Sequence, residues 1–162
     1  MAGEAKGGCV LIKPEGNYYI LQGGPENLGY FEHNEDYQDE QWWWSGPKSA
    51  KPGDIAFIYL TAPVSRIVGR TEIMGEPFHN MAKIFDNPMM DNRWCVPVKV
   101  VIYYPHRFEL TMAGLRSLFS KDWPWLRYPR GGTKIPAHIL PPFLELIDSS
   151  LPRASAPSRS AA

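Results

Sequence analysis

Residues 51–73 read KPGDIAFIYLTAPVSRIVGRTEI and predict two paired β-strands. The apolar run 54–60 follows the turn-forming KPG, and residues 66–73 form a second run after the five-residue turn TAPVS. A connection this short favours antiparallel pairing of the two runs. Gly69 lies inside the second run and indicates a β-bulge or a close approach of neighbouring backbone. We therefore expect a central antiparallel hairpin.

The composition is that of one small globular domain. Its 162 residues include 16 prolines and 14 glycines, which predicts short elements joined by many turns. The 17 basic and 17 acidic residues balance, so a site for a polyanion must be a local patch. Cys9 and Cys95 lack the spacing of a zinc site and are typical of a reducing compartment. No secretion signal or transmembrane run is recognisable, so the sequence predicts a soluble, cytoplasmic protein.

Outward from the hairpin, the pattern predicts a β-rich domain with short helices set apart. Further strands are expected at 9–13, 17–22 and 93–104, and long loops at 23–40, with room for one short helix, and at 74–92. Two helices are expected, one at 111–119 with a threonine as its cap and one at 142–149 with a proline at its start. The expected domain spans 9–151, between a disordered or vector-derived start at 1–8 and a disordered tail or linker at 152–162.

No pattern of a catalytic centre is present. The four histidines are scattered, and no nucleophile elbow, metalloprotease motif or phosphate-binding loop appears. Glu35, Asp36, Asp39 and Glu40 could hold a metal in principle, but a solvated acidic loop is the simpler interpretation. The sequence therefore predicts a protein that is not an enzyme and uses no cofactor and no metal.

The turn RGGTK at 130–134 is the most suggestive polar motif. Its two glycines leave backbone N–H groups accessible, and Arg127, Arg130 and Lys134 surround them. Such an arrangement suits the phosphate of a nucleic-acid backbone. A plain basic turn without a ligand is the alternative.

Tryptophans give the second functional signal. Three of the six stand in a row, and because strand residues alternate between faces, one face cannot bury all three. If this segment is a strand, we expect Trp43 to be buried, and one or both of Trp42 and Trp44, on the opposite face, to face a pocket. Aromatic walls suit flat or methylated groups, because they offer stacking without hydrogen-bond demands. Trp94, Trp123 and Trp125 also lie near loop–strand junctions, and burial in the core is the alternative for each.

The order of motifs resembles the EVE domain family. The motifs are W-S-x-x-K-S-x-K-P-G-D-I-A-F-I-Y from Trp44, then S-R-I-V-G-R-T-E-I from Ser65, then R-W-C-V-P-V-K-V from Arg93. EVE domains have PUA-like folds related to YTH and ASCH domains. The resemblance covers residues 9–151 and implies an α+β fold, a PUA-like pseudo-barrel whose mixed sheet curls into a barrel with short flanking helices.

This resemblance also implies a function and a site. It implies a non-catalytic reader that binds a flipped, modified base in an aromatic cage. Trp44 matches the cage tryptophan, Ser45 follows it with backbone groups for the base edge, and Trp42 or Trp94 is a further wall. Arg130 matches the arginine that grips phosphate in YTH domains, and Arg127 and Lys134 are expected beside it.

Three functions remain open from the sequence. The favoured partner is DNA carrying methylated or hydroxymethylated cytosine, with N6-methyladenine as the second base. The protein would then be the recognition module of a modification-dependent restriction or defence system, with a nuclease or NTPase effector in another domain or subunit. The alternatives are a PUA/YTH-like module for modified RNA, and a small-molecule or protein-interaction domain, which the neutral net charge favours.

Overall fold

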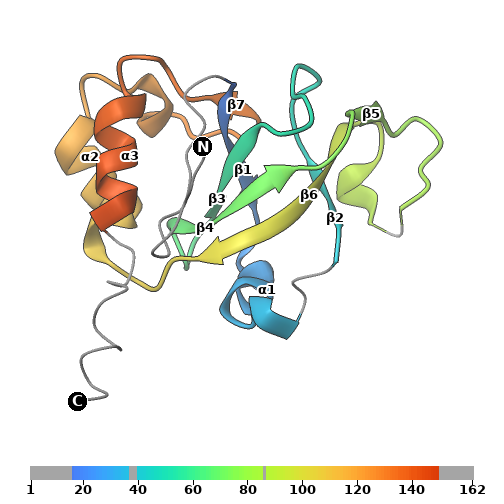
Figure 1. Ribbon diagram of the computed structural model, residues 1–162, viewed down its shortest axis with the longest axis horizontal. Coiled ribbons are helices and arrows are strands. Elements are labelled where there is room, and N and C mark those ends of the chain that lie inside the picture. The colour runs from blue at the N-terminus through green and yellow to red at the C-terminus, as the bar shows by residue number, and fades with distance from the viewer. Residues whose placement is uncertain (1–15, 37–39, 86, 150–162) are drawn as a thin grey trace, which may run out of the picture.

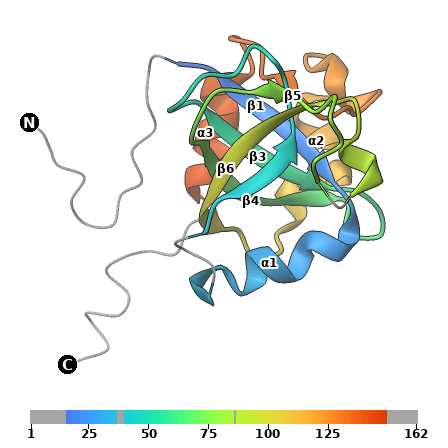
Figure 2. The same ribbon diagram turned by 90° about the vertical axis from the view of Figure 1, so that its right-hand side faces the viewer.

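A curled, mixed β-sheet forms the centre of the protein (Figures 1 and 2). The computed structural model describes residues 16–36, 40–85 and 87–149, so the strand predicted at 9–13 lies outside the described residues. The strands are β1 (Tyr18–Gly23), β2 (Trp42–Ser45), β3 (Ile55–Leu60), β4 (Arg66–Ile73), β5 (Phe78–His79), β6 (Trp94–Tyr103) and β7 (Thr133–Lys134). The α-helices are α1 (Leu28–Glu32), α2 (Met112–Phe119) and α3 (Leu140–Ser149).

The strand order is β2-β6-β4-β3-β1-β7, with β5 pairing the start of β6. β3 and β4 pair antiparallel, which confirms the predicted hairpin. β1 pairs β3 in parallel, from Tyr18 opposite Ile55 to Gly23 opposite Leu60. The sheet is therefore mixed and bent, and with its short flanking helices it forms the predicted PUA-like pseudo-barrel.

Gly69 marks a close approach, as the sequence predicts. A Cβ atom there would lie 2.7 Å from the carbonyl oxygen of Ile102 and 2.8 Å from Cδ1 of Phe31. The pairing of β3 with β4 also shifts register beside it, between Ile58 and Tyr59. Glycine at this position lets α1 and β6 pack against the bent sheet.

Alternation along the strands divides the core between the two faces of the sheet. On β1, Tyr18 and Ile20 pack with the residues of α2 and α3, whereas Tyr19 and Leu21 pack on the other face. The first cluster also contains Trp123 and Trp125, which are 1% and 5% exposed. These two tryptophans are core residues, the alternative that the sequence left open for them.

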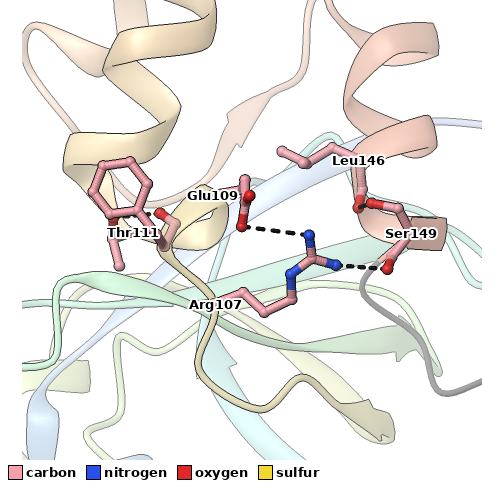
Figure 3. Close-up of polar contacts among 6 residues, drawn as sticks. Arg107, Glu109, Thr111, Leu146 and Ser149 are labelled. Carbon is pink, nitrogen blue, oxygen red and sulfur yellow. Dashed lines mark hydrogen bonds and ion pairs between the residues drawn. The ribbon is translucent and has the colours of Figure 1, made fainter.

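Both predicted helices are present. The Thr111 hydroxyl accepts a hydrogen bond from the Gly114 N–H at 3.0 Å, so Thr111 caps α2. Arg107 connects the segment before α2 to the end of α3 (Figure 3): its guanidinium donates to the carbonyl oxygen of Ser149 at 2.6 Å and lies 3.4 Å from the Glu109 carboxylate. These contacts hold α3 against the sheet face opposite α1.

No helix among the described residues is long and apolar enough to cross a membrane. Nor do three or more histidine, cysteine, aspartate or glutamate side chains gather there as a group that could hold a metal ion. Cys95 is buried as a free thiol, and burial raises its pKa.

Candidate nucleic-acid interface

The three consecutive tryptophans form β2 and separate onto its two faces. β2 pairs antiparallel with β6, with Trp42 opposite Val98 and Trp44 opposite Val96. The rings of Trp42 and Trp44 are half-buried and pack against the core cluster around Leu21. Trp43 points the other way and is 37% exposed, so the prediction that it is buried is wrong. Its ring packs against Phe78 and Phe85, at centroid distances of 5.1 and 5.5 Å.

The Trp44 ring is held in a fixed position. Its indole Nε1–H donates to the carbonyl oxygen of Gln22 at 3.1 Å. The six-membered part of the ring lies so close to Gly23 that a Cβ atom there would collide with it. Phe31 packs against the ring edge-on at a centroid distance of 6.2 Å. One part of the Trp44 side chain therefore packs against the core, and the side chain also lines the cavity described below.

Trp42 has an aromatic partner that the sequence did not indicate. Tyr30 of α1 lies with its ring centroid 4.4 Å from that of Trp42, at an interplanar angle of 55°. Tyr30 itself is 38% exposed. The helix that carries it lies in the long acidic segment for which the sequence allowed one short helix. The walls formed by Trp42 and Trp44 are thus extended by a tyrosine from a different element.

A cavity of about 800 Å³ opens beside these rings. Small-molecule sites have volumes of about 300–1,000 Å³, so the space suffices for a base together with its sugar and phosphate. The lining combines aromatic rings, glycine backbone and amide side chains from five parts of the chain, and it includes Trp43 although that ring lies on the other face of β2. It consists of Gln22, Gly23, Gly24, Glu26, Asn27, Tyr30, Trp42, Trp43, Trp44, Ser45, Gly46, Pro47, Thr61, Asn87, Met89, Met90, Arg93, Gly131 and Gly132.

Of the further predicted cage residues, Ser45 lies at the cavity and Trp94 does not. Ser45 lines the cavity directly after Trp44, as the resemblance implies. Trp94 is not among the lining residues. Its ring stacks on His79 at a centroid distance of 5.1 Å and an interplanar angle of 12°, and it is 36% exposed. The structure therefore brings Trp42, Trp44 and Ser45 together, but not Trp94.

The predicted basic residues do not form one group at the cavity. Arg130 and Lys134 are exposed and flank Gly131 and Gly132, which line it. The Gly132 N–H donates to the carbonyl oxygen of Ile20 at 2.8 Å, so this glycine does not offer its N–H to a ligand.

The Arg130 carbonyl accepts hydrogen bonds from the Trp125 indole at 2.9 Å and the Thr133 hydroxyl at 3.0 Å, which fix this turn. Arg127 instead lines a second depression of about 350 Å³ with Arg116 and Lys121.

Two parts of the cavity lining were not predicted from the sequence: the cation Arg93 and the residues of the segment 87–90. Glu26 and Arg93 are the charged residues in the lining among those that the structure describes. Arg93 is the first residue of the motif R-W-C-V-P-V-K-V, and its position before a motif tryptophan was the available signal. The lining residues Asn87, Met89 and Met90 lie in a segment predicted only as a long loop.

Comparison with known proteins identifies the fold. No family model matches the chain, and no curated protein matches it. Human THYN1 in complex with DNA containing 5-methylcytosine is 16% identical, over 84% of this chain and 99% of that chain, with a TM-score of 0.60. The DUF55 domain of human thymocyte nuclear protein 1 is 15% identical, over 81% and 98%, with a TM-score of 0.62.

A third solved structure belongs to the YTH group. The YTH domain of Zygosaccharomyces rouxii MRB1, in complex with N6-methyladenosine RNA, is 16% identical over 85% of this chain and 90% of that chain, with a TM-score of 0.50. Identities this low show the fold alone. The chain therefore has the PUA-like fold of the EVE-type domains, as the resemblance in its sequence implies.

Proposed function

We propose that the protein is a non-catalytic reader of a modified base in DNA, with methylated or hydroxymethylated cytosine as the favoured target. The observation that carries the proposal is the placement of Trp42 and Trp44 on one face of β2, at a cavity also lined by glycine backbone. An aromatic wall beside exposed backbone can stack on a flat base while main-chain groups reach its edge.

Free energies of known magnitude support this arrangement. Flipping a base out of a duplex costs a few kcal/mol, and stacking on an aromatic side chain returns about 1–3 kcal/mol per base. Burying a methyl-sized group adds about 0.8 kcal/mol, provided that the walls enclose it. Stacking therefore supplies most of the affinity, and contact with the extra methyl group supplies the preference.

The comparisons support DNA as the partner and keep RNA as the second candidate. The THYN1 structure, which has this fold, contains DNA with 5-methylcytosine. The YTH structure, with a lower TM-score, contains RNA with N6-methyladenosine. Recognition of modified DNA would suit the recognition module of a restriction or defence system whose effector is a separate domain or subunit.

A binding panel tests the proposal. Matched oligonucleotides would carry cytosine, 5-methylcytosine, 5-hydroxymethylcytosine, adenine or N6-methyladenine, each as DNA and as RNA. We expect the tightest binding to DNA with a modified cytosine, and an affinity that falls as salt rises because phosphate contacts release counterions. Equal affinity for modified and unmodified strands would refute the proposal, and salt-independent binding would favour a small-molecule or protein partner.

Trp44→Ala tests the cage, with Trp94→Ala as the matched control because the Trp94 ring lies outside the cavity lining. Loss of one stacking wall should remove the preference for the modified base and lower its affinity by roughly 10-fold or more. Because Trp44 is half-buried, the unfolding free energy should fall by about 2 kcal/mol, less than for a core tryptophan. Trp94→Ala should retain the preference.

A further inference from the structure

Met89 stands at the rim of the cavity with an exposure unusual for an apolar side chain. It is 70% exposed and yet belongs to the cavity lining. Its neighbour Met90 is 8% exposed and packs into the protein. The segment between β5 and β6 carries both residues and lies on the side of the molecule that also carries β2 (Figure 1).

The backbone beneath Met89 is fixed by hydrogen bonds. Asn80 is fully buried, and its side chain donates to the Met90 carbonyl at 2.9 Å and accepts from the Ile84 N–H at 3.1 Å. The Asn80 backbone N–H donates to the Arg93 carbonyl at 2.8 Å. At the tip, the Asn87 side chain accepts from the Met89 N–H at 3.0 Å. These hydrogen bonds fix the backbone of the turn that carries Met89 at the rim of the cavity.

We propose that Met89 is an apolar wedge that enters a nucleic-acid duplex and occupies the space left by the base that turns into the cavity. The inference rests on the proposed function. Proteins that kink or open a duplex insert methionine and other apolar side chains between base steps, where the side chain replaces lost stacking. A wedge at the rim of the receiving cavity would act on the same nucleotide that the cavity binds.

A wedge and a cavity wall differ in their expected effects on the affinity for duplex and for single-stranded DNA. A single strand has no stack from which a base must be removed, so it gains nothing from a wedge. Met89 should therefore contribute more to the affinity for a duplex carrying the modified base than to the affinity for the single strand of the same sequence.

The experiment compares wild type, Met89→Ala, Met89→Phe and Met81→Ala on 5-methylcytosine DNA as duplex and as single strand. Met81 is the matched control because it is 63% exposed on the same segment but does not line the cavity. Met89→Ala should weaken duplex binding on the order of 10-fold, as expected for losing the burial of one methionine side chain, and should weaken single-strand binding several-fold less. Met89→Phe should restore duplex binding because phenylalanine also serves as a wedge.

A 2-aminopurine beside the target base should report the same event, because its fluorescence rises on unstacking in wild type and rises less in Met89→Ala. Equal losses on duplex and single strand would make Met89 a cavity wall and overturn the wedge, as would no loss on either. Unmodified DNA of the same sequence is the reference: if the wild-type protein binds modified and unmodified DNA equally, both as duplex and as single strand, the proposed function fails, and the wedge that rests on it falls too.

Discussion

Gly23→Ala tests the position of the Trp44 ring without removing any aromatic group. The new Cβ atom would collide with one ring carbon of Trp44, lie 3.1 Å from its Cη2 and lie 3.3 Å from Nδ2 of Asn27. The Gly23 backbone cannot yield easily, because its carbonyl accepts a hydrogen bond from the Thr61 N–H at 3.0 Å and it pairs with Leu60. The ring must therefore move, toward the cavity or away from Gln22.

The cost follows from the contacts that this movement breaks. Losing the hydrogen bond from the Trp44 indole to Gln22 costs about 1 kcal/mol. Overpacking adds about 1–3 kcal/mol. The unfolding free energy should therefore fall by about 2–4 kcal/mol, and the melting temperature by roughly 5–15 °C. A displaced wall should also weaken binding of the modified base by about 10-fold.

Thermal denaturation and the oligonucleotide binding assay measure these two effects, and near-ultraviolet circular dichroism reports the changed tryptophan environment. Gly29→Ala in α1 is the matched control, because a Cβ atom there meets nothing within 4 Å. It should stabilise the protein slightly, by about 0.5–1 kcal/mol, because alanine favours a helix over glycine. A Gly23→Ala protein that melts and binds like wild type would refute the placement of the Trp44 ring.

Two further predictions concern the charged residues and the helices. Arg130→Ala and Arg93→Gln should each weaken binding of modified and unmodified strands alike and reduce the slope of log affinity against log salt by about one, since phosphate contacts position without specifying. A salt titration checks this, and lost discrimination at unchanged affinity would contradict the role. Thr111→Ala should lower the unfolding free energy by about 1 kcal/mol through loss of the α2 cap, with binding unchanged, as thermal denaturation and the same binding assay will show.

Local patterns predicted the elements whose partners are close in sequence. The hairpin of β3 and β4 followed from two apolar runs and a five-residue turn, and α2 followed from Thr111 as a cap. The close approach at Gly69 was predicted because a glycine inside a strand often marks a bulge or a site where another backbone comes close. In each case the information lies within about twenty residues of chain.

The site depended on contacts that no local pattern contains. β2 pairs with β6 across about fifty residues of chain, and only this pairing determines which tryptophans face the cavity. The stacking of Tyr30 on Trp42 requires that α1 form in a segment without clear periodicity. Trp94 adjoins the same β-ladder, yet it stacks on His79 because β5 pairs there. Tertiary context decides such placements.

Tryptophan indole N–H resonances in a nitrogen-15 spectrum test the central claim most directly, because each of the six tryptophans gives its own signal. Single Trp→Phe variants would assign them. On titration with 5-methylcytosine DNA, we predict large shifts for Trp42 and Trp44, and small or no shifts for the core residues Trp123 and Trp125. Unmodified DNA should shift Trp42 and Trp44 less at equal saturation. Saturated binding that leaves Trp42 and Trp44 unmoved would contradict the account.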